Sequence, residues 1–390
     1  MLKHYFDFFK ILDYAIQNIE GDLPKGFDVA EGLELAKRHR VVSMYFYGLI
    51  NCGYKREDPF MQKAFSDVCT EVLIDERQRY ELSRIEKVFA QNNIHYMLLK
   101  GSLLKNLYCM PEMRSMGDLD ILIKMEQYGE IEKQLTLLGF QKDGESDHEI
   151  LWSNNNCVIE LHKHLIPSYN YDYYEYYGNG WHLAKFNDNN KFYMSNEDNL
   201  VFLFTHFAKH YRDRGIGIRP ILDLRLYSLK YPNLDQEYIM GELKKLKLDK
   251  FYINIIKMLN AWFQGAELNS TTRFLTKRIV ENYVYGNRRN LVLSKALREQ
   301  KANKSVFGMR IKRMLRSVFV PYRVMAARFN SVKRCPILLP FMWVYYFFER
   351  LFQKQKRKTF IKDVSLLNNK QVKEYQKELN FVGLDYNFEE

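Results

Sequence analysis

Short runs of apolar residues mark two buried strands in the N-terminal half of the chain. Ile94–Leu99 and Ile121–Ile123 are apolar almost throughout, which is typical of strands covered on both faces. Between them, Lys100–Ser102 predicts a tight turn and Leu103–Tyr108 a short helix whose leucines share one face. The pattern therefore predicts the order strand, turn, helix, strand.

A hairpin follows, and helical periodicity dominates on both sides of these strands. His148–Asn154 and Cys157–Lys163 read as two strands around three consecutive asparagines. Residues 1–91 predict three or four helices, the last of which begins at Asp58-Pro59, a favourable cap and first-turn pair. From Ser195 to about Tyr285 helical periodicity returns, which indicates a bundle packed on the strands.

Two carboxylates stand where the second strand begins. Asp118 and Asp120 are two residues apart, so on a strand they share a face, with Cα atoms roughly 6.6 Å apart. Left bare, the pair would repel, and a hard divalent ion such as Mg²⁺ would remove that conflict. The alternative is a solvated strand end, where acidic residues are common.

A third carboxylate lies on the second strand of the hairpin. Glu160 alternates with Ile159 and Leu161 and points the same way as His162. If this strand lies beside the one that carries Asp118 and Asp120, the three acids form a cluster able to hold two metal ions. Such a cluster stabilises an in-line displacement at phosphorus.

The turn before the first acid suits phosphate. A strand, a glycine turn and a helix start bring free backbone N–H groups to one point, Gly101 permits close approach, and Ser102 and Lys100 can add a hydroxyl and a charge. Ordinary capping and solvation are the alternatives for these two side chains. Arg114 has two open roles, a bidentate clamp on a phosphate or a pair with a surface acid. Asp223 is expected at a solvated helix position, with a place facing the substrate as the alternative.

These residues resemble a known family. A Gly-Ser turn, an acid-x-acid strand and a later third acid resemble the polymerase-beta-type nucleotidyltransferase superfamily. The fuller string, Leu-Lys-Gly-Ser, Leu-Tyr, Arg114, Gly-Asp-Leu-Asp and Glu-Leu-His, is similar to a bacterial family of uncharacterised nucleotidyltransferases. The resemblance implies an α+β fold with a small mixed β-sheet core flanked by N-terminal and C-terminal helical regions.

The resemblance also implies an activity, which is transfer of a nucleoside monophosphate from an NTP to an acceptor hydroxyl or phosphate with release of pyrophosphate. Two Mg²⁺ ions are implied, with Mn²⁺ as a substitute. Asp118, Asp120 and Glu160 match the catalytic metal ligands. Gly101 and Ser102 match the phosphate turn. Lys100, Arg114 and His162 are the further candidates for nucleotide binding, and His162 is also a candidate partner of Glu160.

Four regions follow from this interpretation. They are an N-terminal helical region (1–91), the catalytic core (92–194), a helical bundle (195–298) and a basic, aromatic C-terminal region (299–390). The acceptor stays open among a small molecule, a sugar, a lipid-linked intermediate and a protein. There are two alternatives to this function. One is a catalytically silent nucleotide-binding or membrane-surface module, and the other is an RNA-directed nucleotidyltransferase.

Composition indicates a folded protein of a reducing compartment. The 390 residues are 47% hydrophobic and 15% aromatic, and the five cysteines form no CxxC pair. The first ten residues contain an acid within their apolar stretch and show no cleavage site, so they predict an amphipathic helix rather than a signal peptide. We therefore expect a cytoplasmic location, with peripheral attachment to the inner face of the membrane as an addition.

The expectation of membrane attachment comes from charge. Gln300–Phe348 contains ten Lys or Arg residues and no acid, which supplies ten of the net charge of +12. Cys335–Phe348 is apolar and aromatic but too short to span a bilayer, which needs about 20 residues. Basic and aromatic residues over 300–358 suit an anionic headgroup region, with ordinary core packing as the equal alternative. Nucleic acid is the weaker choice of partner, since no recognised binding motif accompanies the charge.

Overall fold

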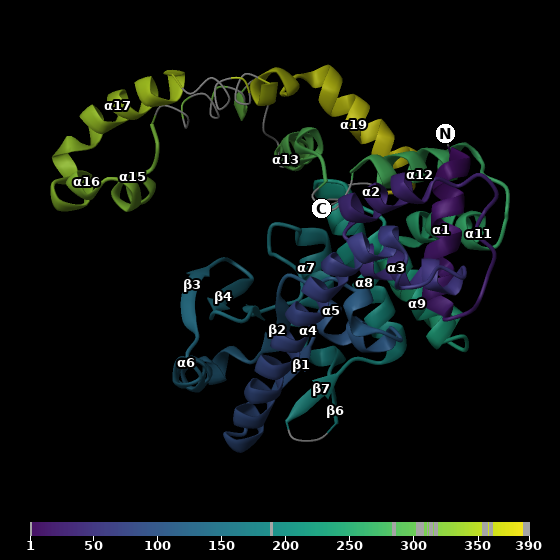
Figure 1. Cartoon of the computed structure of the whole chain (residues 1–390). Coiled ribbons are helices and arrows are strands. Elements are labelled where there is room, and N and C mark those ends of the chain that lie inside the picture. Colours follow the sequence, from purple (N-terminus) through teal and green to yellow (C-terminus); the bar gives the residue numbers. More distant parts are fainter. Residues whose placement is uncertain are drawn as a thin grey trace. The chain divides into compact units, whose positions relative to one another are not determined.

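The computed structural model describes residues 2–187, 190–282, 286–301, 308–309, 311, 315, 319–352, 358 and 362–384. The chain divides into two compact units, residues 1–210 with 216–285, and residues 211–215 with 286–390 (Figure 1). Part of the predicted basic segment lies outside the described residues. The basic positions concerned are Lys304, Arg310, Lys312, Arg313, Arg316, Lys354, Lys356 and Arg357.

The first unit is built on a mixed sheet of seven strands in the order β3-β4-β5-β2-β1-β7-β6. β5 and β2 are parallel, as are β1 and β7, and the other neighbours are antiparallel. The α+β fold predicted from the sequence is therefore confirmed. The strands are β1 (Tyr96–Leu98), β2 (Leu119–Ile123), β3 (Gln141–Glu145), β4 (Glu149–Ser153), β5 (Val158–His162), β6 (Lys185–Phe186) and β7 (Lys191–Tyr193).

Helices enclose this sheet and precede and follow it in sequence. α4 begins at Pro59 after the N-cap residue Asp58, as predicted, and α8 follows Ser195, whose hydroxyl accepts from the backbone N–H of Asp198. The helices of this unit are α1 (Leu2–Gln17), α2 (Val29–His39), α3 (Val42–Asn51), α4 (Pro59–Gln91), α5 (Lys100–Leu104), α6 (Tyr128–Leu137), α7 (Tyr171–Tyr177), α8 (Asn196–Asp213, whose last three residues belong to the second unit), α9 (Arg219–Lys230), α10 (Gln236–Lys245), α11 (Asp249–Phe263) and α12 (Ser270–Asn282).

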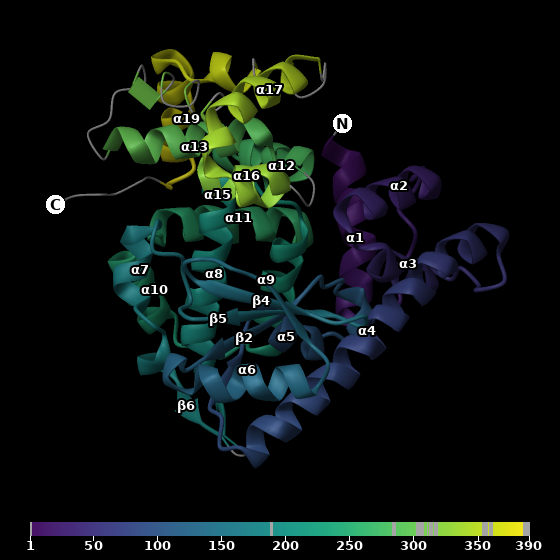
Figure 2. The ribbon, with the colours of Figure 1, turned by 90° about the vertical axis from the view of Figure 1, so that its left-hand side faces the viewer.

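One face of the sheet carries the hydrophobic core. Ile121 and Ile159 point from β2 and β5 into a buried cluster with Ile85 and Phe89 of α4 and Ile131 of α6. Figure 2 shows α6 on this side of the sheet and α8 and α9 on the other. Side chains of a strand alternate between the two faces of the sheet. The residues that directly precede and follow Ile121 and Ile159 in sequence therefore face α8 and α9.

One local prediction was wrong. Lys100–Ser102 is not a separate turn before a helix, because α5 itself begins at Lys100. Lys100 makes the change of direction with φ of 44°, in the left-handed region that residues with a side chain rarely adopt. The strand therefore passes directly into the helix, and Gly101 and Ser102 lie in its first turn.

The second unit is helical where it is described. Val320, Met325 and Val332 form a small core there, against which one side of α17 packs. Its helices are α13 (Arg288–Lys301), α15 (Tyr322–Arg328), α16 (Asn330–Arg334), α17 (Leu339–Phe352) and α19 (Asn369–Phe381).

Candidate active site

Asp120 and Glu160 lie side by side on the sheet face opposite the core. β2 and β5 are parallel neighbours, and their register pairs Asp120 with Glu160 directly. The sequence analysis predicted a cluster of three acids if the strand of Glu160 lay beside that of the aspartates, and the two strands are neighbours. Asp118 immediately precedes β2 and completes the group of three carboxylates.

Asp120 is a buried anion held by two donors. Its Oδ1 lies 2.8 Å from Lys100 Nζ and 2.8 Å from His162 Nε2. Burial alone would raise the pKa of Asp120, but Lys100 and then His162 outweigh it and hold that pKa well below its ordinary value. Burial, followed by the charge of Lys100, lowers the pKa of His162 to about 4, so a neutral ring donates to Asp120 near pH 7.

The pKa values of Glu160 and Asp118 are both raised. Burial, and next the charges of Asp118 and Asp120, raise the pKa of Glu160 to about 8. Burial and Asp120 also raise the pKa of Asp118, against the opposing effects of Lys100, a hydrogen bond with Glu160, and Arg219. The cluster therefore holds a proton at neutral pH that a cation could replace.

The donor set fits a metal ion. One ligand atom each from Asp120, Glu160 and His162 lie within 4.8 Å of one another. Carboxylate oxygens are the ligands that Mg²⁺ prefers, and the raised pKa of Glu160 marks a place where positive charge is missing. A second such group, His148, Glu149 and His162, borders the first because Glu149 of β4 lies opposite His162 of β5.

The residues predicted to bind phosphate are engaged within the protein. Lys100 pairs with Asp120, and the Ser102 hydroxyl accepts from the backbone N–H of Asp120 at 3.0 Å rather than capping α5. A Cβ added to Gly101 would lie 2.6 Å from both Arg114 Nη1 and Met116 Sδ. The absent side chain at Gly101 therefore lets these two residues pack against α5.

Arg114 has an acid partner, but a buried one. Its Nε and Nη2 donate to Asp223 Oδ1 and Oδ2, both at 2.9 Å, and the Tyr108 hydroxyl donates to Asp223 Oδ1 at 2.8 Å. The expectation that Asp223 is solvated was wrong, because α9 turns it into the protein. Arg114 thus ties the segment before β2 to α9.

Arg219, at the start of α9, is a site residue that the sequence analysis missed. Its Nη1 donates to the Ser115 carbonyl oxygen at 2.7 Å, and within the described part of the chain it forms no ion pair with a carboxylate. Burial, and then the charge of Arg114, lower the pKa of Arg219. The positive charge of Arg219 also lowers the pKa of Asp118. Arg219 is therefore a cation beside the acids, and its guanidinium has further N–H donors beyond the one that Ser115 accepts.

Two histidines of α8 line the same region. His206 Nε2 lies 3.0 Å from His210 Nε2, and burial followed by the charge of Lys100 holds the pKa of His206 well below its ordinary value. The ring of His206 is therefore neutral near pH 7 and adds polar atoms without charge on the α8 side.

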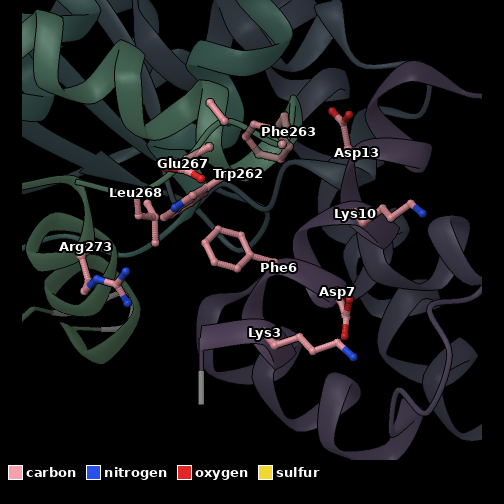
Figure 3. A pocket seen from close by; sticks show the side chains of 13 residues that line it. Lys3, Phe6, Asp7, Lys10, Asp13, Trp262, Phe263, Glu267, Leu268 and Arg273 are labelled. Atoms are coloured by element: carbon pink, nitrogen blue, oxygen red, sulfur yellow. The ribbon is translucent and has the colours of Figure 1, made fainter. Parts of the chain in front are cut away.

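A separate pocket of about 910 Å³ opens between α1 and the end of α11 (Figure 3). Phe6, Trp262 and Phe263 give it aromatic walls, and Lys10 and Arg273 stand at its border. None of the three carboxylates lines it. The pocket is thus distinct from the acid cluster.

Comparison with known proteins identifies the family. A family model described as "Uncharacterised nucleotidyltransferase" matches residues 25–264. The chain belongs to this family. Neither the search of curated proteins nor that of solved structures finds a match.

The matched range places the site within the nucleotidyltransferase part of the chain. It includes every residue of the site, from Lys100 to Asp223, whereas α17 lies beyond it. The protein is thus a transferase by family. Among the described residues, no helix combines the length and apolar character that crossing a bilayer requires.

Proposed function

We propose that the protein transfers a nucleoside monophosphate from an NTP to an acceptor hydroxyl or phosphate and releases pyrophosphate, with Mg²⁺ as the cofactor. The observation that carries the proposal is the meeting of Asp118, Asp120 and Glu160 on one face of the sheet in a member of a nucleotidyltransferase family. The same arrangement supports a place in the polymerase-beta-type superfamily.

Asp118 and Asp120 would hold both metal ions, and Glu160 one of them. When bound, the ions neutralise the donor phosphates and the developing charge, and Mn²⁺ could substitute for Mg²⁺. His162 fixes Asp120 through the 2.8 Å contact, so that its carboxylate keeps one orientation. Where a cation replaces the proton that Glu160 holds, the Glu160 carboxylate could also take the proton of an acceptor hydroxyl.

Arg219 supplies positive charge for the triphosphate, and Lys100 would add to it where a cation replaces Lys100 beside Asp120. Both are largely buried beside the acids, where charge-assisted hydrogen bonds to phosphate are strong. In this proposal Arg219 takes the phosphate contact first considered for Arg114, whose fork is already filled by Asp223. Gly101 and Ser102 shape the strand-to-helix junction that positions Lys100.

We assign catalysis to residues 92–194 and substrate selection to those helices of 1–91 and 195–298 that belong to the first unit. The acceptor is open among a small molecule, a sugar, a lipid-linked intermediate and a protein. The five cysteines are all free, which supports work in the reducing cytoplasm.

The test is calorimetric titration of ATP, GTP, CTP and UTP with Mg²⁺ into the full chain and into the variant Asp118→Asn, Asp120→Asn. We expect metal-dependent binding of at least one nucleotide by the wild type and none by the variant. The matched control is Asp22→Asn, Asp143→Asn, which removes two exposed acids and should bind as the wild type does.

Other outcomes would favour the alternatives. Absence of binding for all four nucleotides, with or without metal, would contradict the donor assignment and favour the catalytically silent membrane-surface module. Nucleotide transfer that requires added RNA and weakens steeply with salt would favour the RNA-directed enzyme.

A further inference from the structure

α17 has two apolar faces, and among the described residues one of them packs on a hydrophobic core while the other is exposed. Leu339, Met342, Trp343 and Tyr346 follow helical spacing and pack on the core of Val320, Met325 and Val332. Trp343 Nε1 also donates to the Val320 carbonyl oxygen at 2.7 Å. This inner face fixes α17 against α15 and α16, which lie beside it in Figure 1.

The outer face of α17 is exposed. Phe341, Val344, Tyr345 and Phe348 recur at helical spacing on the side opposite the inner face, and Ile337 precedes them. Ile337 and Phe341 are 81% and 72% exposed, and the other three are more than half exposed. A continuous stripe of this kind usually marks a surface that binds something.

The charges around the stripe are positive. Lys333 and Arg334 are exposed at the end of α16, just before the stripe begins. Between residues 300 and 358 the sequence holds a single acid, Glu349, and the Arg328 guanidinium pairs with it at 2.5 Å. An anionic partner would therefore meet cations at the border of the stripe, and the one acid of this stretch of sequence is already paired.

We propose that the outer face of α17 docks the protein on an anionic bilayer. With 14 residues and about 1.5 Å of rise per residue, α17 is too short to cross a hydrocarbon core of about 30 Å. It instead lies in the plane of the interface, with Phe341 and Val344 at the acyl boundary and Tyr345 at the headgroups. Lys333 and Arg334 contact the lipid phosphates.

The composition of the stripe favours a lipid surface over nucleic acid. Phe341, Tyr345 and Phe348 could stack on bases. Ile337 and Val344, by contrast, are aliphatic and offer neither a stacking platform nor a hydrogen bond to a base, and Ile337 is the most exposed residue of the stripe. A bilayer accepts such side chains without a matching groove, and its anionic headgroups complement the basic border.

The experiment is sedimentation of the full chain with vesicles of phosphatidylcholine alone or mixed with phosphatidylglycerol. We expect the wild type to sediment with the anionic vesicles and less at high salt. The variant Phe341→Ser, Tyr345→Ser, Phe348→Ser should lose binding about tenfold or more. The variant Lys333→Glu, Arg334→Glu should lose it on anionic vesicles specifically.

The matched control removes three exposed apolar side chains elsewhere, by Leu137→Ser, Tyr171→Ser and Phe186→Ser, and should bind as the wild type does. Circular dichroism checks that each variant keeps its helices. Equal binding by the wild type and the α17 variant would overturn the proposal. So would a wild type that stays in solution with anionic vesicles, forms α17-dependent dimers instead, or binds RNA through the same face.

Discussion

At the scale of single residues, the acid cluster brings together carboxylates whose like charges repel one another. Asp118, Asp120 and Glu160 lie together and partly buried, and the raised pKa of Glu160 measures how unfavourable its charge is there. A protein that needed only stability would have no reason to keep this arrangement. Carboxylates with pKa values shifted in this way are typical of functional sites, so the arrangement supports the cation site proposed above.

Glu160→Gln should stabilise the protein at alkaline pH. Below pH 4.5 Glu160 is protonated in the folded and unfolded states and costs nothing. Between there and its folded pKa of about 8, the folded state keeps a proton that the unfolded state releases, so stability falls as pH rises. Above about 8 the full cost is present, and glutamine avoids it.

The measurement is the melting temperature of both proteins in chelator at about pH 5 and about pH 9. The gain of the variant should grow with pH. Glu57→Gln, at an exposed position, should show no such growth. A pH-independent difference for Glu160→Gln would contradict the raised pKa.

Arg219→Met should weaken nucleotide binding without unfolding the protein. Loss of one charge-assisted contact to phosphate costs about 1.5–3 kcal/mol, or roughly tenfold to a hundredfold in the dissociation constant. The loss should be seen with NTP and with pyrophosphate but be small with the nucleoside alone, by calorimetry with Mg²⁺. Arg77→Met, exposed on α4, is the control. An unchanged affinity for pyrophosphate would remove Arg219 from the donor site.

At the scale of elements, the Arg114–Asp223 pair joins the segment before β2 to α9. Arg114→Met should lower the free energy of unfolding by about 3 kcal/mol or more, because it leaves the buried Asp223 without its counter-charge. Denaturant unfolding followed by tryptophan fluorescence measures this. The double variant Arg114→Met, Asp223→Leu should regain part of the loss, and failure of the single variant to destabilise would show that the pair does not hold these elements.

The strands and helix starts that the sequence predicted share strong local signals. Ile121–Ile123 and the hairpin of β4 and β5 show apolar runs or alternation, and Asp58-Pro59 marks the start of α4 by its own chemistry. These features depend on neighbours within a few residues, and the structure confirms them. Asp118, Asp120 and Glu160 were predicted for the same reason. The two-residue alternation of side chains along a strand can be recognised in the sequence without knowledge of the fold.

The rest of the site depends on distant contacts that leave no local trace. Arg114 and Asp223 are 109 positions apart, so nothing near either residue indicated the other. β3 is polar and exposed, and β6 is only two residues long, so neither shows an apolar period. Arg219 gave no signal because a cation at a helix start looks solvated until the packing of α9 is known.

At the scale of the whole molecule, the chain combines two chemically different surfaces. The family match at residues 25–264 contains the acids and Arg219, whereas the basic segment and α17 lie beyond it. Most of the net charge of +12 falls in that later segment. Nucleotide binding and membrane docking are therefore proposals about different units, and they can fail independently.

This separation predicts that each of two variants loses one kind of binding and keeps the other. The variant Phe341→Ser, Tyr345→Ser, Phe348→Ser should bind nucleotide with Mg²⁺ as the wild type does, because its three changes lie in the second unit and outside the residues that the family model matches. Asp118→Asn, Asp120→Asn should lose nucleotide and still sediment with anionic vesicles, because the stripe on α17 is intact. Both variants are measured in both assays, with each assay run on the same protein preparation. Loss of nucleotide binding in the α17 variant would show that the two units act on one site, which would contradict independent function.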